Sequence, residues 1–569
     1  MPEFIFGSMS SEAWRVAYHK QRRSALWHEH RTIPLAPLAG DKPRLEVTVG
    51  LDSAVERLEC HLIEPERRTI ALAPISTEWD VINWAYFQTW TASLPPYPEG
   101  TVVRYRIEAH LRDGQRPLLA DDGAIFSYLV GDPAPPDWAA EAIIYQIFPD
   151  RFCPDADKGW LQTADLEKPY GGTLKGIIGK LDYIADLGFN CIWLNPFFPD
   201  HTYHGYHATD YFSVNPRLGN EADIRQLVDQ AHARGIRLIL DFVANHWGSR
   251  HLTFQAALKD RQSEYHHWYR WKQWPDEYET YFNVRDLPQI NVDYPAAREH
   301  LLSAARHWLV EYAFDGLRLD YAMGPSHDFW TDLRVAVNQA KPEAWIFGEV
   351  VDTPDRQRSY WGQMHGCLDF ILQQALRELF GFGEISLPYF DALLERHEAF
   401  FPTAYSRPSF LDNHDVDRFL WLVGGDKRKL KLAALCQFTL AGPPIVYYGT
   451  EVGLSQEFGM NQPGGRHSMA EARLPMVWGD DQDADLLAYY RWLIDFRRQH
   501  PVLWRGRRQT VHLDAASGTY AYIRSGEDQA VTVCLNLSDE DRSVAIAGHV
   551  FELAPWSGDV RVETFEPVK

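Results

Sequence analysis

Four apolar segments of the chain end in residues that could do acid–base chemistry. They close with Asp241-Phe-Val-Ala-Asn-His246, Arg318-Leu-Asp320, Gly348-Glu349 and Asp412-Asn-His-Asp415. A polar residue after a single apolar strand is usually a turn former or a helix cap. If several such ends share one pocket, like charges at close range raise the pKa of one carboxyl group and keep it protonated near neutral pH. One protonated and one ionised carboxyl group are what cleavage of a glycosidic bond requires.

The elements that must position these residues are short, apolar, strand-like segments. Eight of them recur along the chain, at Ile143–Phe148, Cys191–Leu194, Arg237–Val243, Gly316–Asp320, Trp345–Glu349, Leu368–Ile371, Ser409–Asp412 and Ile445–Gly449. Stretches between the first three, such as Leu174–Leu187 and Glu221–Arg234, have apolar residues at helical spacing. Eight strand–helix units with fully apolar strands predict a (β/α)₈ TIM barrel, whose chemistry sits at the C-terminal ends of the strands. A doubly wound open sheet is the alternative.

The rest of the chain divides around this barrel. Residues 1–8 read as a cloning remnant ahead of Met9. Alternating β-forming residues from about 33 to 130 predict that residues 9–132 are an N-terminal β-sandwich, similar to carbohydrate-binding domains. A Pro-rich linker at 131–137 precedes the barrel. The predicted boundaries are 138–500 for the catalytic barrel, 247–294 for a subdomain inserted after its third strand, and 501–569 for a C-terminal β-domain.

The inserted segment is rich in aromatic residues. Seven of the seventeen residues from His266 to Phe282 are aromatic, including Trp268, Trp271 and Trp274. A connection of this length is usually functional. Two readings stay open and are compatible: a small folded excursion with its own core, and a surface that contacts sugar.

Composition and charge limit the partners of the chain. It has 569 residues, 56 Lys and Arg against 78 Asp and Glu, and a formal charge of −22. This balance argues against nucleic acid and against an anionic membrane surface, and it permits a neutral ligand. Six scattered cysteines, no apolar run of about 18 residues and no secretory leader predict a cytoplasmic protein.

The strand-end motifs resemble the signature of the α-amylase family of glycoside hydrolases. Asp241–His246, Gly316–Asp320, Gly348–Asp352 and Phe410–Asp415 are similar to its four motifs and occur in family order. His204-Gly-Tyr206 and Gly442–Gly449 extend the likeness. The resemblance is strong over residues 138–500 and weaker in the flanking β-domains.

The resemblance implies a role for each catalytic residue. Asp320 would be the nucleophile of a retaining, double-displacement mechanism, and Glu349 the acid/base. Asp415 would hold sugar hydroxyls and stabilise the transition state. Arg318 would keep Asp320 ionised by lowering the pKa of its carboxyl group. Asp241 would support the site from behind by contacting Arg318.

The same resemblance implies the substrate-binding residues. His246 and His414 would hydrogen-bond the sugar in the −1 subsite, and Tyr206 would stack beneath that sugar. Asn245 matches a residue that binds calcium in many family members, so it is the candidate ligand of a structural calcium ion. No cofactor is expected to be required.

Leu287-Pro-Gln-Ile-Asn291 resembles a motif of the neopullulanase, cyclomaltodextrinase and maltogenic amylase group. The group usually cleaves both α-1,4 and α-1,6 bonds. It implies a hydrolase that cleaves α-1,4-glucosidic bonds of cyclodextrins and short maltooligosaccharides and releases maltose, and a homodimer through the N-terminal domain. This sequence departs from the group after the nucleophile, with Tyr321-Ala-Met-Gly324 where the group has Val-Ala-Asn-Glu. That departure puts cleavage of α-1,6 bonds in doubt.

Three other functions are alternatives to hydrolysis by these residues. An α-glucanotransferase would use the same covalent intermediate. A non-catalytic carbohydrate-binding relative is disfavoured by the intact acids Asp320, Glu349 and Asp415. A metal-dependent hydrolase is disfavoured because the chain lacks the HExxH spacing of such enzymes.

Overall fold

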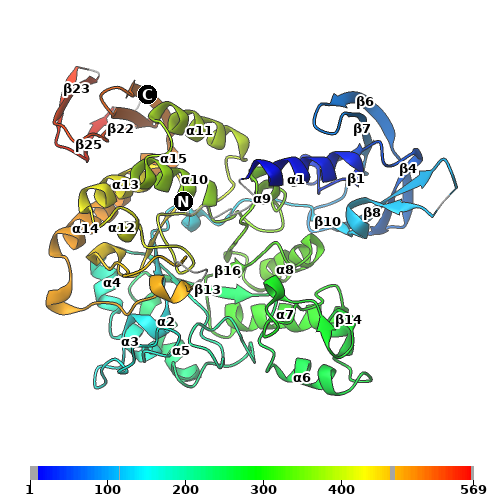
Figure 1. The fold of residues 1–569 in the computed structure, drawn as a ribbon, viewed down its shortest axis with the longest axis horizontal. Coiled ribbons are helices and arrows are strands. Elements are labelled where there is room, and N and C mark those ends of the chain that lie inside the picture. Colours follow the sequence, from blue (N-terminus) through cyan, green and yellow to red (C-terminus); the bar gives the residue numbers. More distant parts are fainter. Residues whose placement is uncertain (1–10, 115, 462–467, 547, 566–569) are drawn as a thin grey trace.

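The computed structural model describes residues 11–114, 116–461, 468–546 and 548–565, and Figure 1 shows their arrangement. The expected cloning remnant at 1–8 lies outside the described residues. Within these described ranges, no helix is both long enough and apolar enough to cross a membrane.

A parallel sheet forms the centre of the molecule. Its hydrogen-bonded order is β17-β16-β13-β12-β11-β19-β18 in the described residues. The bounds of these strands, in chain order, are β11 Ile144–Ile147, β12 Cys191–Leu194, β13 Arg237–Val243, β16 Gly316–Asp320, β17 Trp345–Gly348, β18 Ser409–Phe410 and β19 Pro444–Tyr447. Every pair is parallel, as strands joined by helical crossovers must be.

The sheet closes on itself at the place of the expected sixth strand. Gly348 pairs with Cys367, and Gly366 pairs with Ser406, each as a single parallel bridge. The prediction of a strand at Leu368–Ile371 was wrong, because the Asp369 side chain accepts a hydrogen bond from Leu372 N and starts a helix at Phe370. The closure identifies a (β/α)₈ barrel and excludes the open sheet.

Helices cover the outside of this barrel. The predicted helix over Leu174–Leu187 is two helices, because the chain turns at Gly179 and Lys180. The further helices of the barrel are α3 Leu174–Ile178, α4 Leu181–Leu187, α5 Glu221–His232, α7 Pro295–Val310, α8 His327–Ala340, α9 Pro354–Arg358, α10 Phe370–Leu376, α11 Leu387–Phe400, α12 Phe419–Leu422, α13 Lys427–Thr439 and α14 Ala484–Gln499. A short helix, α2 (Pro149–Phe152), follows β11.

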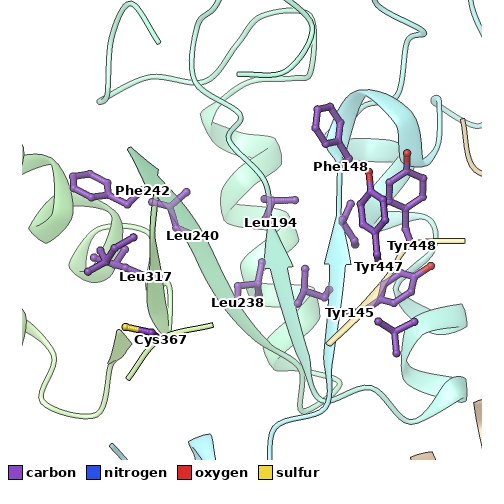
Figure 2. Packing of buried hydrophobic residues seen from close by; sticks show 14 of the residues in the cluster. Tyr145, Phe148, Leu194, Leu238, Leu240, Phe242, Leu317, Cys367, Tyr447 and Tyr448 are labelled. Atoms are coloured by element: carbon purple, nitrogen blue, oxygen red, sulfur yellow. The ribbon is translucent and has the colours of Figure 1, made fainter. Parts of the chain in front are cut away.

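The barrel strands are apolar on both faces. Leu194, Leu238, Leu240 and Leu317 belong to the large cluster between strands and helices (Figure 2). A second buried cluster combines alternate residues of the same strands, Ile144, Cys191, Trp193, Ile239, Trp345, Phe347, Phe410 and Ile445. Since side chains alternate along a strand, Asp241 lies on the inner face with Ile239, and Arg318 and Asp320 share one face of β16.

The N-terminal part forms two antiparallel sheets beside the barrel (Figure 1). One contains β1 Leu26–Trp27, β2 Thr32–Ile33, β3 Arg44–Val49, β6 Ala73–Asp80 and β7 Ala85–Ser93. The other contains β4 Val55–Glu64, β5 Arg68–Ala71, β8 Val102–Leu111, β9 Leu118–Leu119 and β10 Phe126–Leu129. A helix that the sequence reading did not include, α1 (Glu12–Ser24), precedes them.

Two smaller units complete the fold. The insertion after β13 contains α6 (Leu252–Lys259) and a hairpin of β14 (Trp271–Gln273) and β15 (Glu277–Tyr278). After α15 (Val502–Arg505), the C-terminal part has one sheet and one hairpin. Its strands are β20 Arg507–Asp514, β21 Thr519–Ser525, β22 Gln529–Asn536, β23 Arg542–Ile546, β24 His549–Leu553 and β25 Ser557–Thr564.

Candidate active site

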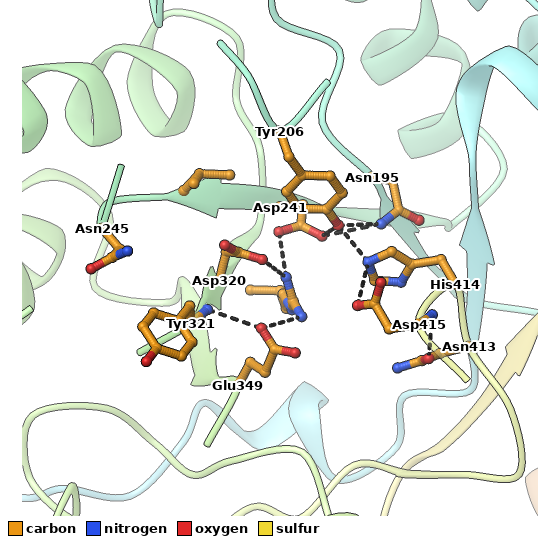
Figure 3. A network of polar contacts seen from close by, with 12 residues as sticks. Asn195, Tyr206, Asp241, Asn245, Asp320, Tyr321, Glu349, Asn413, His414 and Asp415 are labelled. Carbon is orange, nitrogen blue, oxygen red and sulfur yellow. Dashed lines mark hydrogen bonds and ion pairs between the residues drawn. The ribbon is translucent and has the colours of Figure 1, made fainter. Parts of the chain in front are cut away.

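The barrel brings the predicted acids to one end of the sheet (Figure 3). Asp241 and Asp320 lie on the neighbouring strands β13 and β16, and Glu349 directly follows β17. Asp415 comes from the loop after β18. Burial is nearly complete for Asp241 and Asp320, so the charges of these groups act on one another in a site with little water.

Arg318 is the centre of this arrangement. Its Nη1 donates to Asp241 Oδ1 at 2.8 Å and to Asp320 Oδ1 at 2.7 Å. Its Nη2 lies 2.9 Å from Glu349 Oε2. The guanidinium is fully buried over the Trp193 ring. One cation therefore holds three carboxylates, and this shared contact keeps Asp320 and Glu349 close together.

The pKa of Asp320 differs from the expectation. Burial raises the pKa of its carboxyl group well above the ordinary value, the Arg318 ion pair opposes this rise, and the charges of Glu349, Asp241 and Asp415 add to it. Arg318 does lower the pKa of Asp320, as predicted, but this one shared cation does not outweigh burial and three like charges, so the expectation that it keeps Asp320 ionised is not met. The Asp320 carboxyl group therefore takes up a proton at a pH where an isolated aspartate is ionised.

Asp415 has a different environment. Burial alone would raise the pKa of its carboxyl group, but His414, Arg473 and Arg318 hold it well below the usual range. Its Oδ1 accepts from Arg473 Nη2 at 2.8 Å, and its Oδ2 lies 3.0 Å from His414 Nε2. Asp415 is thus an ionised carboxylate with fixed geometry, suited to binding hydroxyl groups.

Glu349 is held on one side only. Its Oε2 accepts from the backbone N–H of Tyr321 at 2.9 Å and forms the ion pair with Arg318 Nη2. Its side chain is 14% exposed, against 9% for Asp320. This greater access suits a group that exchanges protons with a leaving group and with water.

A chain of hydrogen bonds fixes Tyr206 and His414. The Tyr206 hydroxyl donates to Asp241 Oδ2 at 3.0 Å. Asn195 Nδ2 donates both to the Tyr206 hydroxyl oxygen and to Asp241 Oδ2. Asn195 therefore presents its oxygen to Gln146 Nε2, at 3.0 Å, and Gln146 Nε2 donates to His414 Nδ1 at 2.8 Å. This leaves the His414 Nε2 proton for Tyr206 and Asp415, 2.6 Å and 3.0 Å away. The Tyr206 and His414 rings are parallel, with 5.5 Å between centroids.

His246 packs against an aromatic residue of the insertion. Its ring stacks on Tyr281 at 4.6 Å. Burial lowers the pKa of His246 to about 3, so the imidazole is neutral. The charges of Asp320, Glu349 and Asp415 add to the effect of burial in raising the pKa of Tyr281, which places Tyr281 beside the three acids.

Asn245 does not have the surroundings of a calcium ligand. Its Oδ1 accepts from Gln289 Nε2 at 3.0 Å, and its Nδ2 lies 3.0 Å from His246 Nδ1. Calcium takes six to eight oxygen ligands, mostly carboxylates and carbonyls. The amide and imidazole groups that contact the Asn245 side chain in the described residues do not fit that requirement.

Three residues of the site were missed in the sequence. Arg473, almost fully buried, contacts Asp415 and the His414 carbonyl, and nothing in its local sequence indicates this. Gln146 could have been found, because it is a polar residue inside the apolar segment Ile143–Phe148. Tyr281 was only one of several aromatic residues in the insertion.

The three tryptophans of the insertion serve mainly its own packing. Trp268 is buried, and Trp271 is packed against the same core. The indole N–H of Trp274 donates to the Ala257 carbonyl at 3.0 Å. Tyr281 and Phe282 instead contact Tyr321, with ring centroids 4.8 and 5.3 Å away. The insertion thus packs onto the large hydrophobic cluster of the barrel and also extends to the candidate site.

The surroundings of the segment Tyr321–Gly324 account for its unusual residues. Tyr321 has a positive φ of 39°, a backbone conformation that persists only where the surroundings enforce it. Ala322 is buried and accepts from the indole of Trp330 at 2.9 Å. A Cβ on Gly324 would lie 1.9 Å from Asn245 Oδ1, so the glutamate typical of the resembled group has no room here.

Comparison with known proteins agrees with this geometry. Residues 146–500 match the family model described as the alpha amylase catalytic domain. The chain is 33% identical to "Alpha-amylase 2" of Dictyoglomus thermophilum, over 98% of this chain and 95% of that protein. It is 35% identical to "Neopullulanase 2" of Thermoactinomyces vulgaris, over 72% of each chain.

Solved structures give the same likeness. The cyclic α-maltosyl-(1→6)-maltose hydrolase of Arthrobacter globiformis superposes with a TM-score of 0.69 and 31% identity, over 76% of this chain and 100% of that one. A cyclomaltodextrinase superposes with a TM-score of 0.68 and 28% identity, over 92% of each chain.

Proposed function

Because the chain belongs to the α-amylase family of glycoside hydrolases, we propose that it cleaves α-1,4-glucosidic bonds of cyclodextrins and other cyclic or short maltooligosaccharides, with release of maltose. The observation that carries the proposal is the contact of Asp320 and Glu349 with one buried guanidinium, that of Arg318. The names of the relatives, neopullulanase and cyclomaltodextrinase among them, support the substrate class.

In the first step, an oxygen of Asp320 attacks the anomeric carbon of the bound glucose. The glycosidic bond breaks, Glu349 gives its proton to the leaving oxygen, and a β-glycosyl ester of Asp320 forms. Because the pKa of Asp320 is raised, its carboxyl group holds a proton, and we expect this proton to reside on Glu349 once the substrate is bound.

In the second step, Glu349 takes a proton from water, and the water oxygen attacks the anomeric carbon. The ester bond breaks, and Asp320 leaves as a carboxylate. Retaining enzymes need their two carboxylates about 5–5.5 Å apart, and the shared contact with Arg318 suits that short separation. Asp415, His414 and Tyr206 would hold the sugar in the −1 subsite throughout both steps.

Transfer of the glucosyl group to a sugar hydroxyl is the second candidate. Tyr281, Phe282 and Tyr321 form an aromatic group beside the acids, and Phe282 is 66% exposed. Aromatic faces of this kind bind sugar rings, so an acceptor sugar could replace water in the second step.

Chromatography of products tests the proposal. The enzyme is incubated with α-, β- and γ-cyclodextrin, pullulan, starch, maltotriose and a cyclic tetrasaccharide, with the Asp320→Asn variant as control. Maltose from cyclodextrins, first released as the α-anomer, is expected. Ladders of longer products at high maltotriose concentration would indicate the transferase, and no turnover of any glucan by the folded wild type would refute both.

We also propose a homodimer through the N-terminal sheets and a cytoplasmic location. The tip of the β6–β7 hairpin exposes Trp79, Trp84 and Tyr86, whose rings contact one another. Light scattering should give a dimer for the wild type and a monomer for Trp84→Ser; equal masses would contradict the interface.

A relative named "Intracellular maltogenic amylase" of Bacillus subtilis, 31% identical over 72% of this chain, supports the proposed cytoplasmic location. Fractionation of the source cells would check it.

A further inference from the structure

The loop that carries Tyr206 also holds an aspartate and three histidines that the proposed hydrolysis does not use. These are Asp200, His201, His204 and His207. One ligand atom from each of Asp200, His201 and His207 lies within 4.8 Å of the other two. The His207 ring is 5.3 Å from the His201 ring and 4.9 Å from the His204 ring, centroid to centroid.

The carboxylate of this group is buried without a permanent cation. The Asp200 side chain has no exposed surface, and its ion-pair partners among the described residues are His201 and His204, at 3.6 and 3.9 Å. Its hydrogen bonds come from neutral donors, Thr202 N and Oγ1 and His207 N, at 2.6, 2.7 and 3.0 Å. Buried carboxylates are normally paired with a cation or bound to a metal.

The two neighbouring imidazoles each have an unused ring nitrogen. Nδ1 of His201 and Nδ1 of His207 are buried atoms without a hydrogen-bond partner in the described residues. Such atoms are rare in folded proteins, because each costs the free energy of its lost hydration.

We propose that Asp200, His201 and His207 form a binding site for a divalent cation of the zinc class. Two imidazoles and one carboxylate are a ligand set that zinc uses, with a water molecule as the fourth ligand. Hard cations such as calcium and magnesium prefer oxygen ligands and are disfavoured here. The His201 side chain is 21% exposed, which gives the ion a path from solvent.

The place of this site in the fold gives the ion a structural role. Asp200 and His207 lie on either side of Tyr206 in the chain, and an ion bound to both ties the two ends of the loop together. The loop is already anchored: Arg217 Nη2 donates to the Asp200 carbonyl at 2.9 Å, and Gly248 N donates to the Ala208 carbonyl at 2.8 Å. These two bonds fix the loop at its ends, and the ion would add a link between Asp200 and His207. The ion would thus hold the Tyr206 ring in place without taking part in bond cleavage.

Zinc binding to the full-length, chelator-treated protein tests the proposal. Isothermal titration with zinc chloride should give about one ion per chain, because Asp200, His201 and His207 form a single set of ligands. His201→Ala and Asp200→Asn should each weaken binding at least tenfold. Cobalt(II), which replaces zinc and is coloured, should give a visible absorption band in the wild type that both variants lose.

A second cluster supplies the matched control. His61 and His110 lie close to Glu59 on the N-terminal sheets, with His61 Nε2 3.6 Å and His110 Nε2 3.2 Å from one oxygen of Glu59. His61→Ala should bind zinc as the wild type does. Zinc should also raise the melting temperature of the wild type and of His61→Ala, and not that of His201→Ala.

Three outcomes would overturn the proposal, and two of them concern the proposed ligands: no zinc bound by the wild type, or binding that survives both His201→Ala and Asp200→Asn. Loss of binding in His61→Ala alone would place the ion on the N-terminal sheets and would equally refute it. Circular dichroism of each variant checks that it is folded, and His201→Ala removes a partly exposed ring with an unpartnered Nδ1. None of these measurements depends on turnover of a glucan.

Discussion

Replacing Gly324 with alanine should destabilise the barrel, because the new methyl group has no room. The added Cβ would lie 1.9 Å from Asn245 Oδ1, 2.6 Å from Asn245 Cγ and 3.0 Å from Tyr321 Cδ1. Asn245 must move to admit it. That movement breaks the hydrogen bond from Gln289 Nε2 to Asn245 Oδ1 and disturbs His246, whose Nδ1 lies 3.0 Å from Asn245 Nδ2.

The size of the effect follows from these contacts. Overpacking of a dense interior costs about 1–3 kcal/mol, and loss of one hydrogen bond adds about 0.5–1.5 kcal/mol. The expected loss in free energy of unfolding is therefore about 2–4 kcal/mol. An unfolding entropy of about 2.1 cal/mol/K per residue over residues 146–500 converts this loss into a decrease in melting temperature of about 3–5 °C.

Scanning calorimetry with a matched glycine measures this decrease. Gly159 has no heavy atom within 4 Å of the position of an added Cβ, so Gly159→Ala controls for the intrinsic effect of the substitution. Gly324→Ala should also lower kcat/KM through His246, and Gly324→Glu should lower both quantities further. Equal melting temperatures for Gly324→Ala and Gly159→Ala would refute the steric argument.

Four further outcomes are expected. Asp320→Asn should abolish hydrolysis and leave oligosaccharide binding measurable, which product assays and calorimetry check; substantial residual activity would contradict the nucleophile role. The same variant should melt higher than the wild type at pH 7. Burial raises the pKa of Asp320 in the folded state, so this residue weakens folding above the pKa of the unfolded state, and the gain should vanish below about pH 4. Glu349→Gln should lose about 10²–10⁴-fold in kcat/KM on maltooligosaccharides and much less on substrates with acidic leaving groups; equal losses would count against the acid role. Arg473→Gln should move the acidic limb of the pH–rate profile to higher pH, because Arg473 helps to hold the pKa of Asp415 down; an unmoved limb would show that this ion pair does not control Asp415.

The barrel could be predicted because its strands carry the signal themselves. Gly316–Asp320 and Arg237–Val243 were expected as strands and have those bounds in the structure. Both are short apolar segments that are buried on both faces, which is the pattern of a parallel sheet. The acids could be located for the same reason, since Asp320 ends such a segment, Glu349 directly follows one, and Asp415 lies in the loop after another.

The sixth strand could not be predicted from local sequence. Leu368–Ile371 is apolar enough for a strand, but the hydrogen bond to the Asp369 side chain starts a helix there. The pairing instead falls on Gly366 and Cys367, and a Cβ on Gly366 would lie 1.8 Å from the Ser406 carbonyl oxygen. This requirement depends on a residue forty positions away, and no local pattern reveals it.

The first helix was missed for a different reason. Its signal was present, because Ser11 precedes Glu12 and the Ser11 side chain accepts from Trp14 N at 3.2 Å as an N-cap. The β-forming runs that begin near residue 33 are longer than this signal and indicate a β-domain for the whole region. Arg473 had no local signal, since its partner Asp415 lies 58 residues earlier.

The difference between Asp320 and Asp415 follows from how two arginines are shared. Arg318 contacts three carboxylates, those of Asp241, Asp320 and Glu349, so each receives only part of one positive charge. Asp415 has the close contact with Arg473, accepts from His414, and keeps a side chain that is 29% exposed. The buried, crowded carboxylate therefore takes up a proton, and the separately paired one stays ionised. The chemistry proposed here needs one mobile proton and one fixed negative charge, and the unequal sharing of these two cations supplies both.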